Sequence, residues 1–459
     1  MKNVYFDTNE LDNRVVSEFG ISQEILLENA GGNLERLVRK KLKKGSKILA
    51  LCGTGNNGAD ALCALRKLSG DYECYALLIG EKQNKLNQKQ ANTAKIANVK
   101  FVSKLGLADC YIDGIFGTGL NKELDPELCK ILKTINKTNA LKIAVDIPSG
   151  IYKDGKIGKI AFEADYTMTM GALKAGLFSD AAKDFVGKIK VANLGLSEKN
   201  FQNNSDMFLL TKQDLNLPFR KTQNTNKGEF GHTFLIAGDM LGAAQIAGLA
   251  SSAIGSGLVS VVSEEPLVNL NPLLMQKKSL QGAKVVVCGP GLGNKKVDLA
   301  QLKDKICVID ADLCYNKEVI ELLSKNENIV LTPHPKEFVS LLKLANIADV
   351  SVSELQENRF KYAKMWSEKF KSVLVLKGAN TIIAQNSQIY ISNLGSCALA
   401  KGGSGDVLAG IIAGLLAQGY APLDAATNGV LAHALSAKKF KQNDYSLNSL
   451  DIIKGLKWL

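Results

Sequence analysis

A glycine-rich stretch near the end of the chain, AKGGSGDVLAG at residues 400–410, carries a single carboxylate, Asp406. The apolar residues after it recur at helical spacing up to Leu416, which predicts that a helix begins beside the glycines. Backbone amides at such a helix start can hold an anion, and a carboxylate there can accept a proton from an attacking hydroxyl. The stretch therefore predicts a phosphoryl-transfer site. The simpler alternative is an acidic residue that only complements the helix dipole.

A second set of polar residues follows three apolar runs in the first half of the chain. The sequences are GTGNNGAD (53–60), IDGIFGTGL (112–120) and VDIPSG (145–150). Ligands of open parallel sheets lie beyond the carboxyl ends of the strands, so we expect one crevice to collect Asn56, Asn57, Asp60, Asp113, Asp146 and Ser149. Their oxygens suit a monovalent cation, and the glycines leave backbone N–H groups for a phosphate. Taken singly, each could instead be a turn former or a helix cap.

Short apolar runs, many of them β-branched, alternate with helical patterns and must position these residues. The expected strands are 47–51, 74–80, 108–114 and 142–148, then 232–238, 257–262, 283–289, 305–312, 328–335 and 372–378, with a hairpin at 381–393. This alternation predicts α/β units with parallel sheets covered by helices. Because the chain has 459 residues and a polar passage at 197–227, we expect two domains, at 1–210 and 211–459.

The composition restricts the compartment and the partners. The N-terminus lacks the apolar core of a secretory signal, and no run of about 18 uncharged apolar residues occurs, so no membrane partner is expected. Nine cysteines without a C-x-x-C pair favour a reduced cytoplasmic compartment, with the thiols as small core residues. The net charge of +12 invites a nucleic-acid interpretation, but much of it is lysine at helix ends, as in residues 39–47. We therefore expect no nucleic-acid partner.

The chain has only three histidines, His232, His334 and His433, and none lies in a metal-ligand pair. The pattern predicts no zinc site. His334 stands between two prolines, which is typical of a stiff loop. His232 heads an expected strand and His433 lies on an apolar helix face, so both are expected to have structural or supporting roles.

Residues 1–210 resemble the NAD(P)H-hydrate epimerase family in CGTGNNGADA, DGIFGTGL and VDIPSG, and in GISQEILLENAGGNL at 20–34. The resemblance implies that Asn57, Asp113 and Ser149 share a potassium ion. It also implies substrate contacts from Asn56, Asn57, Gly58, Ala59, Asp60, Gly117, Thr118, Gly119, Leu120, Asn121, Lys122, Glu123 and Asp146. Asp146 is our candidate for proton transfer. Ala59 and Ala61 stand where the family usually has glycine, which predicts an earlier helix start or a less close approach of the phosphate.

Residues 225–440 resemble the ribokinase-like superfamily, and within it the ADP-dependent NAD(P)H-hydrate dehydratases. The resemblance rests on KGEFGHTFLIAG, GSGLVSVV, CGPGLG, DADLCYN, LTPHPKEF, KGANT and AKGGSGDVLAG, in that order. It implies that Ala243, Gly291, His334 and Asp406 contact the substrate and that Asp406 is the catalytic carboxylate. It implies nucleotide contacts from Lys377, Gly378, Ala379, Asn380, Thr381, Gly402, Gly403, Ser404 and Gly405.

In this order the halves resemble the bifunctional NAD(P)H-hydrate repair enzymes. The resemblance implies that the first half interconverts the R and S forms of NADHX and NADPHX, the hydrated nucleotides. The second half would dehydrate the S form with ADP and Mg²⁺, giving AMP and phosphate. We further expect a cytoplasmic homo-oligomer. A small-molecule kinase, which would not need the first half, and a nucleotide-sensing scaffold with degenerate sites remain the alternatives.

Overall fold

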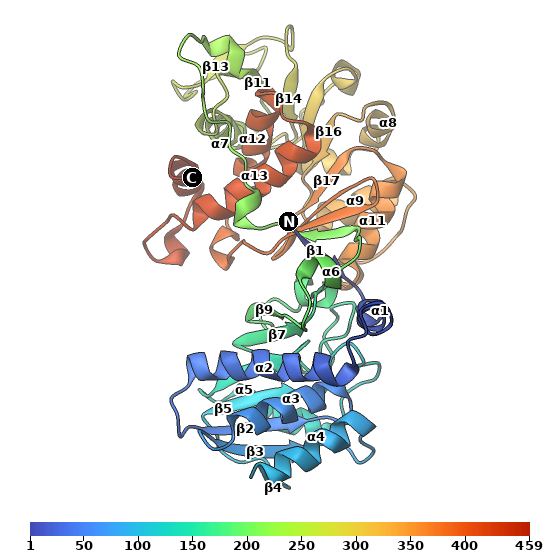
Figure 1. Ribbon diagram of the computed structural model, residues 1–459. Helices are drawn as coiled ribbons and strands as arrows, with labels where there is room; N and C mark the ends of the chain where they lie inside the picture. The colour runs from blue at the N-terminus through green and yellow to red at the C-terminus, as the bar shows by residue number, and fades with distance from the viewer. The chain divides into compact units, whose positions relative to one another are not determined.

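The computed structural model describes residues 1–459 and divides them into two compact α/β units (Figure 1). The N-terminal unit is Asn3–Ser205, and the C-terminal unit is Asp206–Leu459 together with Met1–Lys2. The division falls a few residues before the expected end at 210. The reason is that β10 (Met207–Leu209) pairs with β19 (Gln388–Ser392) of the C-terminal unit.

The N-terminal unit contains a parallel seven-stranded sheet of order β4-β3-β2-β5-β6-β7-β9. Its strands are β2 (Lys47–Cys52), β3 (Glu73–Leu78), β4 (Lys100–Val102), β5 (Cys110–Gly114), β6 (Leu141–Val145), β7 (Tyr166–Met170) and β9 (Lys188–Ala192). A separate parallel pair joins β1 (Lys2–Tyr5) to β8 (Leu173–Lys174). The expected strands β2, β3, β5 and β6 are confirmed. The sequence pattern missed β4, β7 and β9, which are short or alternate with polar residues.

Helices cover both faces of this sheet. The helices are α1 (Asn9–Phe19), α2 (Gln23–Lys41), α3 (Asn56–Leu68), α4 (Lys85–Ile96), α5 (Pro126–Asn136) and the short α6 (Glu198–Phe201). Within β2, Ile48 and Ala50 join the core formed with α1 to α4, whereas Leu49 and Leu51 join the core formed with α5. A strand buried on both faces in this way needs a continuous apolar run, as its sequence has.

The sheet of the C-terminal unit has the order β13-β12-β11-β14-β15-β16-β17-β18-β19-β10. Its other strands are β11 (His232–Ile236), β12 (Leu258–Val262), β13 (Met275–Lys277), β14 (Val285–Cys288), β15 (Ile306–Ile309), β16 (Ile329–Leu331), β17 (Val373–Leu376) and β18 (Thr381–Gln385). Pairing is parallel from β13 to β17. The expected hairpin is confirmed as β18 and β19, which pair antiparallel.

One core of the C-terminal unit is formed with α7 (Leu241–Ala253), α12 (Ser404–Ala417), α13 (Pro422–Ala437) and α14 (Ser449–Leu456). The remaining helices are α8 (Glu318–Lys325), α9 (Pro335–Leu344), α10 (Val352–Glu357) and α11 (Arg359–Lys369). Helix α12 is the helix predicted after the glycine-rich stretch. Its Gly410 packs directly on α7, because a Cβ added there would lie 2.0 Å from the carbonyl oxygen of Ala247.

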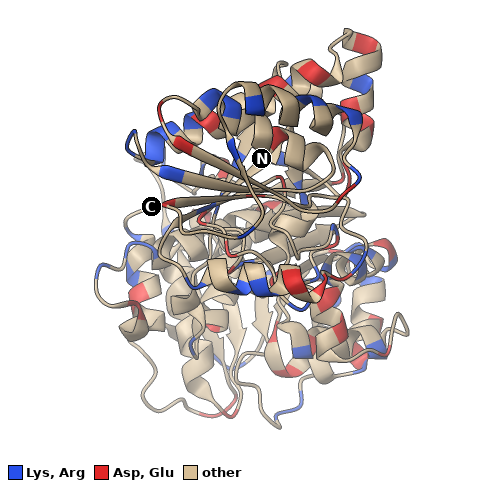
Figure 2. Cartoon of the chain, turned by 90° about the horizontal axis from the view of Figure 1, so that it is seen from below, with Lys and Arg blue, Asp and Glu red and all other residues tan.

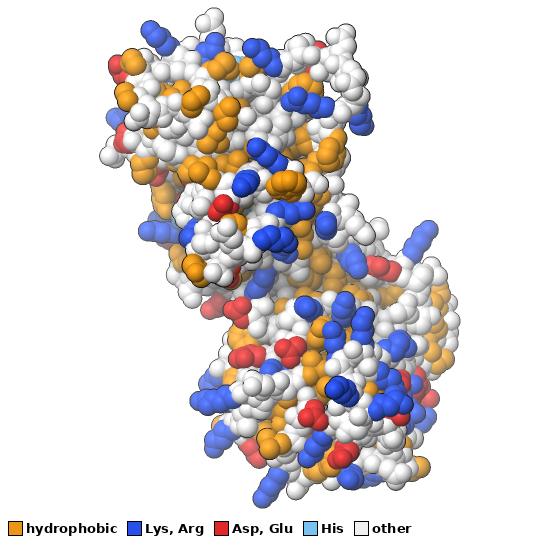
Figure 3. Space-filling view, turned by 90° about the vertical axis from the view of Figure 1, so that its left-hand side faces the viewer, with side chains coloured by type: hydrophobic (Ala, Val, Ile, Leu, Met, Phe, Trp, Pro, Cys, Tyr) orange, Lys and Arg blue, Asp and Glu red, His pale blue; other side chains and the backbone are white.

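Charged side chains lie mainly on helices and loops, while the strands are largely uncharged (Figure 2). Basic side chains are spread over the face seen in Figure 3, with acidic and hydrophobic ones between them. All nine cysteines are free thiols; seven are buried, as expected of core residues, whereas Cys129 is half-buried and Cys397 exposed. None of the helices has the length and apolar character needed to cross a membrane.

The packing of α12 on α7 predicts that Gly410→Ala lowers the free energy of unfolding by about 1–3 kcal/mol, since the new methyl group overlaps backbone atoms. Denaturant unfolding measures this loss. Gly242→Ala is the matched control, because an added Cβ there meets nothing within 4 Å, and its stability is expected to stay equal or rise slightly. Equal stability of the two variants would contradict the close contact.

Candidate active sites

In the N-terminal unit, α3 begins at Asn56 and Gly55 is its N-cap. Ala59 and Ala61 are fully buried inside this helix, so both alanines belong to the helix and not to the loop before it. The loop before the helix is closely packed. A Cβ at Gly53 would lie 2.0 Å from the carbonyl oxygen of Ile115, and one at Gly58 would lie 2.0 Å from that of Gly53. Only glycine permits this approach of the loops after β2 and β5.

Asp113 and Ser149 form a buried pair at the ends of β5 and β6. The Ser149 hydroxyl donates to Asp113 Oδ1 and its backbone N–H donates to Oδ2, each at 2.7 Å. Burial raises the pKa of Asp113 to about 6, although these hydrogen bonds lower it. Asn57 is held separately, because its Nδ2 donates to the carbonyl oxygen of Val145 at 2.9 Å. Both atoms of its amide lie beside Gly117, where an added Cβ would be 2.7 Å from Nδ2 and 2.8 Å from Oδ1.

These three side chains supply a carboxylate, a hydroxyl and an amide oxygen, a donor set that suits a hard monovalent cation. The amide orientation fits this use, because the Asn57 nitrogen is already occupied and its oxygen remains available. No group of three or more His, Cys, Asp or Glu side chains is arranged so that it could hold a metal ion. A cation here would therefore depend on neutral oxygens as well as on Asp113.

Asp146 follows β6 with a positive backbone φ of 67°. Its Oδ1 lies 2.6 Å from Lys174 Nζ and accepts the backbone N–H of Met170 at 3.1 Å and the hydroxyl of Thr169 at 3.3 Å. Lys174 is only 2% exposed. The other oxygen of Asp146, Oδ2, faces Gly117 beside Asn57. One oxygen is thus fixed while the other faces the loop after β5.

The sequence reasoning missed Lys174, although a lysine inside the apolar segment GALKAGLF was a usable signal.

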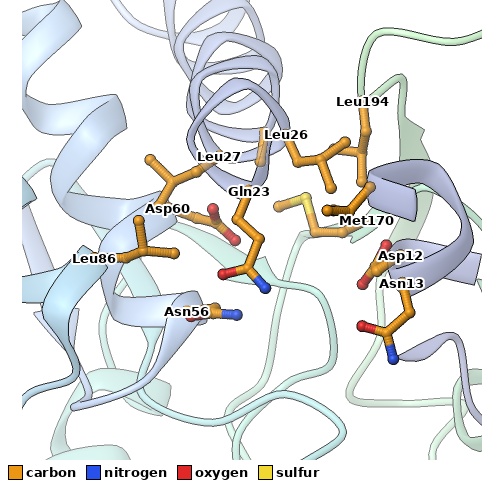
Figure 4. Close-up of a pocket in the computed structure, with 12 residues that line it drawn as sticks. Asp12, Asn13, Gln23, Leu26, Leu27, Asn56, Asp60, Leu86, Met170 and Leu194 are labelled. Atoms are coloured by element: carbon orange, nitrogen blue, oxygen red, sulfur yellow. The ribbon is translucent and has the colours of Figure 1, made fainter. Parts of the chain in front are cut away.

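Asn56 and Asp60 line a pocket of the N-terminal unit (Figure 4). Its complete lining is Asp12, Asn13, Val16, Gln23, Leu26, Leu27, Ala30, Asn56, Asp60, Leu86, Met170 and Leu194. The residues from α1 and α2 were not expected to contribute polar groups. Burial raises the pKa of Asp60 well above its usual range and that of Asp12 to about 6.

Some of the expected substrate-contact residues of this unit do not direct their side chains toward a ligand site. Ala59 and Leu120 face the hydrophobic core, so only their backbone is available to a ligand. Glu123 pairs with Lys159 at 2.6 Å, while Asn121 and Lys122 are exposed.

In the C-terminal unit, α12 starts at Ser404 after Gly403, whose φ is +81°. Asp406 lies in the first turn, where the sequence predicted it. Burial and the nearby Asp310 carboxylate raise the pKa of Asp406 to about 6, against the opposing effect of Lys377. A Cβ added at Gly405 would lie 3.3 Å from Lys377 Nζ and 3.8 Å from Asp310 Oδ2. The glycine loop, the lysine and both carboxylates therefore meet.

Lys377 is paired with acidic side chains. Its Nζ lies 2.7 Å from Asp310 Oδ1 and 3.9 Å from Glu337 Oε2. Glu337 accepts the backbone N–H of His334 at 2.7 Å, and its own N–H donates to His334 Nδ1 at 3.1 Å. His334 is thus the exposed N-cap of α9, consistent with the stiff loop predicted. The roles of Asp310 and Glu337 were missed, although the motifs DADLCYN and LTPHPKEF contain them.

Ala243 and Gly291 are brought together, since a Cβ at Gly291 would lie 2.8 Å from the Cβ of Ala243. Gly291 has a φ of +62°. His232 is not part of this contact. Its Nε2 forms a hydrogen bond with Ser260 Oγ at 2.8 Å.

Three further side chains hold the two candidate nucleotide loops. Arg359, only 4% exposed, donates to the carbonyl oxygens of Leu376, Lys377 and Asn380 at 3.0–3.1 Å. His433 Nε2 lies 3.1 Å from Ser404 Oγ, and burial lowers the pKa of His433 to about 4. Ser449 donates to the carbonyl oxygen of Gly402 at 3.1 Å. Arg359 and Ser449 are distant in sequence from the motifs they support, so no local pattern reveals them.

Two α/β units, each with a glycine-rich loop and buried carboxylates at strand ends, define a class of two-site nucleotide-handling enzymes. Residues 233–457 match the family described as NAD(P)H-hydrate dehydratase, and residues 23–176 match the family described as YjeF-related protein N-terminus. The chain is 41% identical to the bifunctional NAD(P)H-hydrate repair enzyme Nnr of Helicobacter pylori, with 100% of both chains covered. The chain belongs to the family of bifunctional NAD(P)H-hydrate repair enzymes.

Other relatives are similar over most of their length. The enzyme of the same name from Coxiella burnetii is 32% identical, covering 93% of this chain and 92% of its own. That of Escherichia coli is 30% identical, covering 91% and 85%. A solved structure of an ADP/ATP-dependent NAD(P)H-hydrate dehydratase from Bacillus subtilis is 28% identical and covers 55% of this chain and 96% of its own, with a TM-score of 0.46.

The hydrogen bonds of Arg359 predict that Arg359→Met lowers the free energy of unfolding by about 3 kcal/mol or more, because three buried carbonyl groups lose a charged donor. Denaturant unfolding and ADP titration calorimetry measure the effect, and weaker ADP binding is expected with it. Lys361→Met is the matched control, since Lys361 is an exposed residue of the same helix and should change stability by less than about 0.5 kcal/mol. A stable Arg359→Met variant would contradict the supporting role.

Proposed function

We propose that this chain repairs hydrated NADH and NADPH with one activity in each unit. The N-terminal unit interconverts the R and S epimers, and the C-terminal unit dehydrates the S epimer with ADP, releasing AMP and phosphate. The observation that carries the proposal is the meeting of Asp406, Lys377 and the glycine loop at the start of α12. This site lies in a chain that is similar over its whole length to an enzyme named for NAD(P)H-hydrate repair.

Dehydration needs a better leaving group than hydroxide. In the proposed reaction, Asp406 accepts the proton of the C6 hydroxyl while its oxygen attacks the terminal phosphorus of ADP. The backbone amides of Gly402–Gly405 lie at the start of α12 and stabilise the negative charge of the transferred group. The phosphate then leaves C6, assisted by the lone pair of the ring nitrogen, and NADH or NADPH remains.

Mg²⁺ is part of the proposal as the counter-ion of the nucleotide phosphates, which it binds through few protein ligands. Asp310 is the carboxylate that suits it, because it lies beside the loop that would hold the phosphates. When bound, the ion would neutralise charge on the phosphates. His334, Ala243 and Gly291 are proposed to contact the hydrated nucleotide.

For the epimerase, we propose Asp146 as a proton-transfer group because one of its oxygens is held by Lys174 while the other faces Gly117. A potassium ion held by Asn57, Asp113 and Ser149 would supply a fixed positive charge near the substrate phosphates. The substrate contacts proposed are residues 56–60 and 117–123, with the backbone acting at Ala59 and Leu120.

The direct test is to incubate the protein with a mixture of both epimers, Mg²⁺ and ADP, and to follow the absorbance of the reduced nicotinamide. Complete conversion of both epimers supports the two activities. Conversion of neither epimer would contradict the proposal, and an arm with ATP in place of ADP defines the donor.

Asp406→Asn is expected to lower dehydratase turnover by roughly 10²-fold or more, because the amide cannot accept the proton. ADP affinity and epimerase activity should stay near wild type. In the wild type, the dehydratase rate should fall as the pH drops through about 6, where Asp406 becomes protonated. Kinetics of both activities on this variant, with calorimetry for ADP, separate the effects. A near-wild-type dehydratase rate would remove Asp406 from the mechanism.

Asn57→Ala is expected to impair epimerisation and to abolish its dependence on potassium, while dehydration of the pure S epimer persists. The epimerase rate is measured with potassium and with a large organic cation in its place. Asn139→Ala, an exposed asparagine of the same unit, should keep both the rate and the potassium response. Potassium dependence that survives in Asn57→Ala would contradict the cation site.

A further inference from the structure

Asp60 differs from the other carboxylates of the N-terminal unit because it is buried without a partner. It projects from the first turns of α3 into the pocket, toward Gln23 (Figure 4). Its side chain is 7% exposed and makes no hydrogen bond or ion pair within the protein. Leu26 and Leu27 of α2 form apolar walls beside it. A buried polar group without a partner is costly, so such a group at a cavity wall indicates that a ligand supplies the partner.

Asp146 is the contrasting carboxylate. Lys174, the Met170 N–H and the Thr169 hydroxyl all donate to its Oδ1, so this oxygen has three partners within the protein. Met170 also lines the pocket that contains Asp60, so the loop that anchors Asp146 forms part of the same cavity wall. Asp146 itself does not line this pocket, but it is bound to Met170 of the pocket wall and is close enough to act electrostatically on Asp60.

Asp60 is in the environment that favours the neutral acid. Burial raises its pKa, and the charges of Asp146 and Asp12 raise it further, while Lys174 acts in the opposite direction. These are the charged groups that face it, from the end of β6, from α1 and from β8. A carboxyl group whose surroundings favour the neutral form can donate a proton to a ligand in its pocket.

We propose that Asp60 is a second catalytic residue of the epimerase and donates the proton that complements the one accepted by Asp146. The inference rests on the proposed epimerase function and gives a specific role to a residue treated above only as a substrate contact.

The proposed step is the opening of the cyclic carbinolamine of the hydrated ring. Asp146 accepts the proton of the C6 hydroxyl, the C6–N1 bond breaks, C6 becomes an aldehyde, and Asp60 protonates N1. Rotation about the C5–C6 bond then presents the other face of the aldehyde. N1 attacks C6, Asp60 takes the N1 proton back, and Asp146 returns its proton to the oxygen. Atoms and charges balance, and both carboxyl groups recover their initial states.

Asp60→Asn is the sharpest test because it replaces a neutral acid by a neutral amide of the same shape, so the fold should persist. We expect kcat of epimerisation to fall by roughly 10²-fold or more, with KM within about threefold of wild type. In Asp60→Ala, added formate should restore part of the lost kcat. Asp184→Asn is the matched control, since Asp184 is an exposed carboxylate of the same unit and its kcat should not change.

A kcat within tenfold of wild type in Asp60→Asn, a loss confined to KM, or an absence of rescue by formate would overturn the proposal. A KM effect alone would make Asp60 a substrate-binding group. Failure of the proposed function is distinguishable, because the wild-type protein and Asp184→Asn would then also show no epimerase activity.

Discussion

Each unit pairs one lysine with carboxylates, fully buried in the N-terminal unit and partly buried in the C-terminal unit, and the charge of each candidate site depends on that pairing. Lys174 holds Asp146 in the N-terminal unit, and Lys377 holds Asp310 in the C-terminal unit. Removing one partner of a buried ion pair leaves an uncompensated charge, which costs about 3–5 kcal/mol. Each lysine carries one positive charge and has more than one carboxyl group near it. Burial, and after it the neighbouring carboxylates, raise the pKa values of Asp60 and Asp406 against the opposing effect of the lysine.

This imbalance explains how one kind of side chain can act in different ways. Asp406 has a pKa of about 6, so it is ionised at neutral pH yet basic enough to accept a proton. Deeper burial and two neighbouring carboxylates raise the pKa of Asp60 well above its usual range. Neither property belongs to aspartate itself; each follows from where the backbone puts the carboxyl group relative to the lysine.

The backbone reaches these positions because glycines permit contacts that a Cβ would block. Gly53 and Gly58 allow the start of α3 to lie against the loop after β5, and Gly410 allows α12 to lie against α7. Both helices thereby direct their first turns, and the N–H groups there, toward the carboxyl ends of parallel strands. A phosphate-bearing ligand is suited to both places for the same electrostatic reason.

Most elements and motifs could be predicted from the sequence, because both depend on local order. Apolar runs predicted most strands, and the spacing after the glycine-rich stretch predicted α12. The polar residues after β2, β5 and β6 were also predicted to lie at one sheet edge, since parallel strands require it. Strand β7 escaped prediction because Thr167 and Thr169 interrupt its apolar pattern although both are buried.

The partners of these groups follow from the three-dimensional fold. Lys174 reaches Asp146 from β8, Arg359 reaches the loop after β17 from α11, and Asp12 reaches the pocket of Asp60 from α1. These contacts join segments far apart in the chain, and no periodicity or motif encodes them. Charge states depend on burial and on such partners, because taking a charge out of water without a counter-charge costs free energy. The fold therefore sets the charge states as well.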